Sequence, residues 1–119
     1  MAEKLAGLNK NETVKTVYSA GDTVTLAGET CGYGRVTSDK KKAILFLPIK
    51  TDDSVTSVTM SYTGTAYSSS AQGASSISSN AITRPNCEQL RIEATLSSQA
   101  STGGVAATGY YNNLVLTFS

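Results

Sequence analysis

The residues of this chain best suited to binding chemistry lie in the run Tyr110-Tyr111-Asn112-Asn113. A tyrosine ring offers an apolar face on which a sugar can stack, while its hydroxyl and the asparagine amide form hydrogen bonds. Successive side chains of a strand point to opposite faces of a sheet, so only one of Tyr110 and Tyr111 can meet a ligand. The candidate ligand-binding residues are Tyr110, Tyr111 and Asn112. The alternative is tyrosines at the edge of a sandwich with their hydroxyls in water.

No pattern in the sequence predicts catalysis. The chain contains no histidine, which removes the usual general base and the commonest metal ligand. A nucleophilic serine requires a base, and nothing in the sequence supports a Ser-Lys pair. Asp52-Asp53 is the only adjacent acidic pair, and aspartates favour turns because they hydrogen-bond the local backbone. We therefore predict a protein that is not an enzyme and has no metal site and no cofactor.

The composition argues against nucleic-acid and membrane partners. The formal net charge is +1, so no general field attracts nucleic acid or anionic lipid. The run Lys40-Lys41-Lys42 is short, and we expect it to be a solvated turn. No apolar run approaches the length of a membrane span, and the first residues lack the apolar core of a secretory signal. Membrane insertion is not expected, and synthesis in a cytoplasm is.

Two cysteines, Cys31 and Cys87, lie in separate segments that a sandwich could bring together. Either they pair in a disulfide, or they are two small, partly buried thiols in a reducing compartment. Both alternatives stay open, although the missing secretory signal favours the thiols.

The elements that would position these residues are organised around the run KKKAILFLPIK, residues 40–50. Its five consecutive apolar residues are bounded by charge and stopped by Pro48, which predicts a strand and not a buried helix. A strand that is apolar on both faces belongs in a sandwich interior or under a covering layer. Proline cannot donate to a ladder, so this strand ends or bulges at Pro48 or lies at an edge.

Alternation of apolar and polar residues predicts further strands on either side of this run. A long strand over residues 55–67 is expected to bulge or bend at Gly64. The segment 28–34 is predicted to be a glycine-rich loop. The segment 68–80 is predicted to be a polar surface excursion in which Ile77 could pin a short strand, with Tyr62 and Tyr67 framing a rim beside it. The predicted inward-facing residues are Val24, Leu26, Leu90, Ile92, Ala94, Leu96, Leu114, Leu116 and Phe118.

About seven or eight short strands, with turn signals roughly every 8–12 residues, predict an all-β domain over residues 13–119. The expected architecture is an antiparallel β-sandwich or jelly roll without internal repeats. Residues 1–12 are expected to form an extended N-terminal arm, which is disordered alone unless an assembly contact orders it.

The segment Gly34-Arg35-Val36-Thr37, the polar turn after it, and Ile44-Leu45-Phe46-Leu47-Pro48-Ile49 resemble part of a known family. The family is a small β-sandwich domain found in structural proteins of tailed bacteriophages. In that group a Gly-x-Val-Thr hairpin leads to a strand ending in Leu-Pro-Ile. A Ser/Thr/Gly-rich middle follows, and the domain finishes on an alternating apolar strand. The similarity runs from Ser19 to Ser119.

The resemblance implies a non-enzymatic virion structural or accessory protein displayed on the particle surface, as a capsid decoration, a head fibre or a tail-fibre domain. It implies location in the virion after assembly in the host cytoplasm, and a homo-oligomer, with a trimer favoured. Residues 1–12 would contact other virion proteins, and the loop-rich end would face outward, where a host surface glycan is a candidate partner. The alternatives are a free-standing carbohydrate-binding module or lectin, and an exported bacterial adhesin domain.

Overall fold

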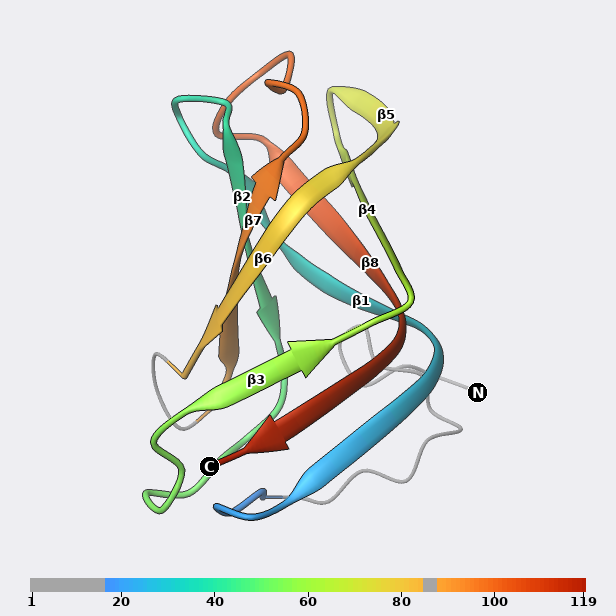
Figure 1. Cartoon of the computed structure of the whole chain (residues 1–119). Coiled ribbons are helices and arrows are strands. Elements are labelled where there is room, and N and C mark those ends of the chain that lie inside the picture. The colour runs from blue at the N-terminus through green and yellow to red at the C-terminus, as the bar shows by residue number, and fades with distance from the viewer. Residues whose placement is uncertain (1–16, 85–87) are drawn as a thin grey trace, which may run out of the picture.

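The computed structural model describes residues 17–84 and 88–119, and within these ranges the chain is all-β, with no helix. The strands form one antiparallel sheet in the order β5-β4-β8-β1-β2-β7-β6, and β3 pairs with the C-terminal part of β8. Figure 1 shows that the sheet curls into a half-barrel, so that β3 and β4 approach β6. The eight strands are β1 Thr23–Val36, β2 Lys42–Leu47, β3 Val58–Ser61, β4 Gly64–Ser69, β5 Gln72–Ser75, β6 Ile77–Thr83, β7 Leu90–Leu96 and β8 Ala106–Phe118.

The prediction of an all-β, antiparallel domain is therefore confirmed, whereas the division into the two sheets of a sandwich or jelly roll is not. The strands form one continuous sheet because β1 and β8 are long, with 14 and 13 residues, and pair along almost their whole length. The far side of β8 pairs with β3 over residues 115–118 and with β4 over residues 107–112. The predicted arm, residues 1–12, lies outside the described residues.

Strand β2 confirms the strand predicted from the central apolar run, and it ends one residue before Pro48. It is a central strand, paired with β1 on one side and β7 on the other. Its inner face carries Ala43, Leu45 and Leu47, which are 0% exposed. Its outer face carries Ile44 and Phe46, which are only half-buried. The apolar run therefore supplies the core from one face only.

The core fills the concave, inner face of the half-barrel, and every inward-facing residue predicted from alternation is buried there. Fully burying one leucine or isoleucine contributes about 1.5–3 kcal/mol. A polar contact also crosses the interior: the Tyr111 hydroxyl of β8 donates to Asn80 Oδ1 of β6 at 3.1 Å. Asn80 Nδ2 in turn donates to the Tyr62 hydroxyl at 2.8 Å. These bonds link β8 to β6, two strands that are not neighbours in the sheet.

The predicted loop at residues 28–34 is wrong, because this segment is part of β1. Close backbone approach explains the glycine at position 34. A Cβ atom there would lie 1.7 Å from the Ile44 carbonyl oxygen of the neighbouring strand, so glycine is required where β1 approaches β2 this closely. Gly109, on β8, lies against side chains instead: a Cβ there would lie 2.4 Å from Leu45 Cδ1, which is the mobile end of the leucine.

Two polar segments also differ from expectation in part. The predicted strand over residues 55–67 divides into β3 and β4, and the break falls directly before Gly64, as the glycine indicated. The segment 68–80 lies at the surface as predicted and a strand begins at Ile77, but the segment is more regular than expected, because it also holds the end of β4 and the whole of β5. Ile77 is buried as expected, at 8% exposed. Serine-rich strands are tolerated here because they lie at the two ends of the strand order, with one face open to solvent.

Gly34→Ala tests the close approach of β1 to β2. We expect the substitution to lower the free energy of unfolding by about 2–4 kcal/mol, because the added methyl group meets backbone that cannot move without disturbing the sheet. Chemical denaturation measures the effect. The matched control is Gly73→Ala in β5, where a Cβ would meet nothing within 4 Å and the change should stay within about 0.5 kcal/mol. Equal effects at the two sites would contradict this reading.

Candidate functional site

The structure separates the three predicted site residues. Tyr111 points inward and is 0% exposed, and burial raises its pKa above the usual value. Tyr110 and Asn112 instead share the outer, convex face of the sheet, where Tyr110 is half-buried and Asn112 is exposed. The prediction that the two tyrosines face opposite sides is confirmed, and Tyr110 is the one that a ligand can reach.

A local irregularity decides which tyrosine faces outward. Extending the inward alternation of Phe118, Leu116 and Leu114 back along β8 would turn Tyr110 inward. Asn113, however, adopts a left-handed conformation with φ of 52°. The register between β1 and β8 shifts at this point, between Leu26 and Glu29. Asn112 and Asn113 are consequently both exposed, and the inward phase continues on Tyr111. A bulge of this kind re-aims the side chains that follow it.

Tyr110 and Asn112 line a hollow of about 530 Å³ on the outer face of β1, β8 and β4, which we call the outer hollow. The Tyr110 hydroxyl and Ser68 Oγ lie 3.2 Å apart at one side. The small residues Gly64 and Ala66 are directly opposite Asn112 and Tyr110 in the register, which leaves space above β4. The lining residues are Glu29, Gly64, Thr65, Ala66, Ser68, Tyr110 and Asn112.

Glu29 is the site residue that sequence reasoning missed. It follows Gly28, which has φ of 77°, and it stands directly opposite Asn112 in the register. The Gly28 amide donates to Asn113 Oδ1 at 3.2 Å, which ties the irregular part of β1 to that of β8. A glycine inside an alternating strand followed by a charged residue, and an Asn-Asn pair in the partner strand, are signals of a bulge that could have found it.

A second hollow of about 530 Å³ lies between the region before β3 and the end of β6. Its charged groups are already engaged with each other: Arg84 Nε donates to Thr51 Oγ1 at 2.6 Å, and Arg84 lies 3.5 Å from the Asp53 carboxylate. Arg84 is the last of its lining residues and the last described residue before position 88. The predicted rim of Tyr62 and Tyr67 is wrong, because Tyr67 is 0% exposed and Tyr62 is bonded to Asn80 in the interior.

Asp52 has the turn role that the sequence predicted. Its carboxylate accepts hydrogen bonds from the hydroxyls of Ser19 and Ser54, and from the Ser54 amide at 2.9 Å. The hydrogen bond from Ser19, followed by those from Ser54, holds the pKa of Asp52 below its ordinary value of 3.8. These bonds connect the turn before β1 to the loop before β3. Among the described residues, no group of three or more His, Cys, Asp or Glu side chains could hold a metal ion.

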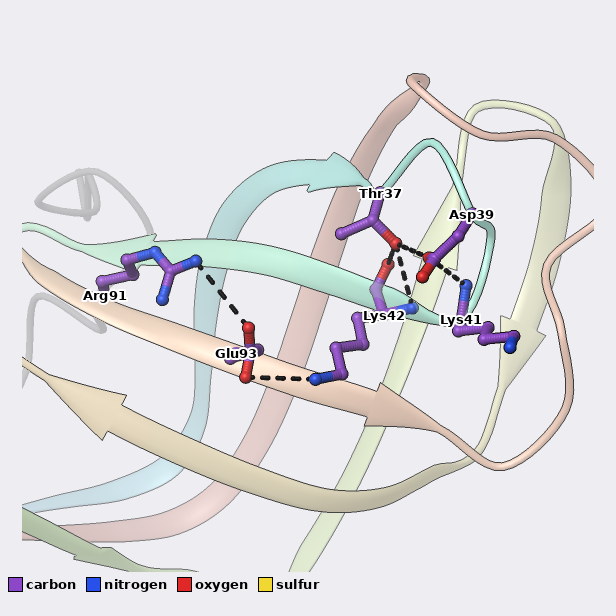
Figure 2. Close-up of polar contacts among 6 residues, drawn as sticks. All are labelled: Thr37, Asp39, Lys41, Lys42, Arg91 and Glu93. Atoms are coloured by element: carbon purple, nitrogen blue, oxygen red, sulfur yellow. Dashed lines mark hydrogen bonds and ion pairs between the residues drawn. The ribbon is translucent and has the colours of Figure 1, made fainter.

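Lys40 and Lys41 lie in the turn before β2, as predicted, whereas Lys42 is the first residue of that strand (Figure 2). The Thr37 hydroxyl donates to Asp39 Oδ1 at 2.6 Å, and the Lys41 amide donates to the same oxygen at 3.0 Å. These bonds, the one from Thr37 being the stronger cause, lower the pKa of Asp39. Lys42 extends along the outer face to Glu93, 3.3 Å away, and Arg91 lies 3.9 Å from the same carboxylate. Glu93 thus partly neutralises this end of the outer face.

Cys31 is buried at 4% exposed, while Cys87 lies outside the described residues, so their pairing stays a prediction. Within the part of the chain that the structure describes, no helix is long and apolar enough to cross a membrane.

Comparison with protein-family models, with curated proteins and with solved structures found no match. The resemblance to the phage domain therefore rests on the sequence segments that carry it.

Asp52→Asn tests the turn carboxylate. Because the folded pKa lies below 3.8, the ionised carboxylate stabilises the fold above that pH. This contribution is lost as the pH falls through the folded pKa. We expect the variant to have a lower Tm than the wild type at pH 7, and the difference to shrink below pH 4.

The control for this measurement is Asp53→Asn, whose side chain is 99% exposed and takes part in a surface ion pair. Such pairs contribute little, so the Tm of this variant should stay close to that of the wild type. Thermal unfolding followed by circular dichroism across the pH range checks both. A constant Tm difference between the wild type and Asp52→Asn at every pH would show that the charge is not what stabilises the turn.

Proposed function

We propose that this chain is a non-enzymatic structural or accessory protein of a phage virion, displayed on the particle surface. In that role it decorates the capsid or forms part of a head fibre or tail fibre, and it assists attachment to a host surface glycan. The observation that carries the binding part of this proposal is the outer hollow, where Tyr110, Asn112 and Glu29 converge on a solvent-facing surface. The virion part is supported by the resemblance of residues 34–37 and 44–49 to the phage domain.

The two faces of the sheet differ in the side chains that they carry, and this difference supports a binding role over a catalytic one. The inner face of the half-barrel is filled by aliphatic and aromatic side chains. The outer face carries the polar and aromatic groups, including Tyr33, which is 47% exposed. The proposal includes membership of the β-sandwich or jelly-roll class, which the approach of β3 and β4 to β6 favours.

The proposal also includes self-association, with a trimer favoured and residues 1–12 making contacts to other virion proteins. The half-buried outer residues Ile44 and Phe46, beside the exposed Tyr33, leave apolar area that association would cover. Symmetric association adds burial to a domain of this size and makes its stability depend on concentration.

Sedimentation equilibrium of the full chain over a wide concentration range tests the assembly. We expect the weight-average mass to rise to three times the chain mass, and the Tm to rise with it. Removing residues 1–12 should weaken binding to purified particles while the folded domain remains. A chain that stays monomeric at every concentration and does not bind particles would overturn the virion role.

The second candidate function is a free-standing carbohydrate-binding module, which the outer hollow also supports. A monomer that binds glycans without any affinity for particles would favour it. Glycan binding lost in Tyr110→Ala but retained in Tyr111→Phe is expected under either reading, because Tyr111 is 0% exposed on the inner face. The experiment that separates the two functions is therefore the assembly measurement and not the glycan measurement.

A further inference from the structure

The outer hollow contains a charged residue, Glu29, in addition to the aromatic Tyr110. Glu29 and Asn112 stand directly opposite each other across β1 and β8, and both are exposed. The Glu29 carboxylate has no ion-pair or hydrogen-bond partner among residues 17–84 and 88–119. Among the residues that the structure describes, those that line the hollow include this one carboxylate and no basic side chain. The hollow therefore presents a negative charge at its mouth.

The hollow has one group that only accepts hydrogen bonds, the Glu29 carboxylate, and three groups that both donate and accept. A carboxylate accepts hydrogen bonds only, and it can accept two from adjacent donors. The Asn112 amide donates and accepts, and the Tyr110 and Ser68 hydroxyls, 3.2 Å apart, do both. The Tyr110 ring supplies the apolar contact area, because the neighbouring positions on β4 are Gly64 and Ala66. A ligand that fits has an apolar face and several hydroxyl or amino donors along one edge.

We propose that the outer hollow binds a hexose unit that carries no negative charge, a neutral or amino sugar, with Tyr110 against the sugar ring and Glu29 and Asn112 on its donors. The inference rests on the proposed glycan-attachment function and names its site and ligand class. Glu29 provides the discrimination: it accepts from the hydroxyls or the ammonium group of such a sugar and repels the carboxylate of a uronic or sialic acid. Specificity is commonly achieved by a repulsive group of this kind in addition to the attractive contacts.

The bulge is what builds this site. Gly28 and Asn113 both have positive φ, and the hydrogen bond between them fixes the point at which β1 and β8 lose regular register. Gly64 keeps space for the Asn112 side chain, since a Cβ at position 64 would lie 3.0 Å from Asn112 Nδ2. The position of the hollow thus depends on Gly28 and Asn113, which form the bulge, and on Gly64, which leaves space for Asn112.

The test uses the full chain on an array that places neutral hexose and amino-sugar oligosaccharides beside oligosaccharides of uronic and sialic acids. We expect binding to the first group and none to the second. Isothermal titration with the tightest neutral or amino-sugar oligosaccharide then compares variants. Glu29→Gln and Tyr110→Ala should each weaken binding roughly tenfold or more, as expected for loss of a hydrogen bond to a charged group or of the aromatic contact. Glu29→Gln should also admit acidic oligosaccharides.

Two further variants separate a loss of binding from a loss of folding. Gly64→Ala adds one methyl group that must displace the Asn112 amide, and it should weaken binding while the Tm stays near that of the wild type. Glu93→Gln, on the same outer face but bonded to Lys42 and outside the hollow, should leave binding unchanged.

The outcomes separate this inference from the function on which it rests. Preference for acidic glycans, or glycan binding that is insensitive to the Glu29, Tyr110 and Gly64 substitutions, overturns the inferred site and ligand class but leaves glycan attachment standing. Silence across the whole array overturns glycan attachment itself, and this inference with it.

Discussion

A single sheet buries an apolar face without a second layer only if it curls on itself, and this constraint governs the whole molecule. Two features allow the curl. Glycine at position 34 admits the close approach of β1 to β2, and the Tyr111–Asn80–Tyr62 hydrogen bonds join β8 and the segment between β3 and β4 to β6 across the interior. A buried hydroxyl without a partner would cost about 1–3 kcal/mol, so these bonds also make it possible to bury Tyr111 completely.

The core occupies most of the inner face, and the outer hollow lies on the opposite, convex face. A convex sheet surface has no deep cleft. Shallow hollows form on it where the side chains are small or where the register shifts. The shift between Leu26 and Glu29 creates such a place, where a glutamate, an asparagine and a tyrosine from β1 and β8 gather over the small residues of β4. The outer hollow and the core thus lie on the two sides of the same strands.

The regular part of this fold was predictable from the sequence, and the irregular part was not. The alternating residues of β7 and of the C-terminal half of β8 are buried as predicted. Residues two apart on a strand lie on the same face of the sheet, so alternating apolar residues mark the face that is buried. The sequence predicts a loop for the glycine-rich half of β1 and, apart from a short strand at Ile77, a polar excursion for the serine-rich segment that holds β5 and the start of β6. Their composition lacks strand propensity, and their strand conformation comes from pairing with distant partners in the sheet. Tyr110 and Asn112 were found as site residues, whereas Glu29 needed the register.

Local periodicity is enough to predict that the chain is all-β and that the alternating aliphatic residues of β7 and of the C-terminal half of β8 are buried. It also predicts the strand that precedes Pro48. The single curled sheet, the burial of Tyr111 in place of Tyr110, and the position of Glu29 opposite Asn112 are seen only in the folded molecule. Each of these depends on register between strands far apart in the chain, and a single left-handed residue, Asn113, inverts every side chain before it on β8.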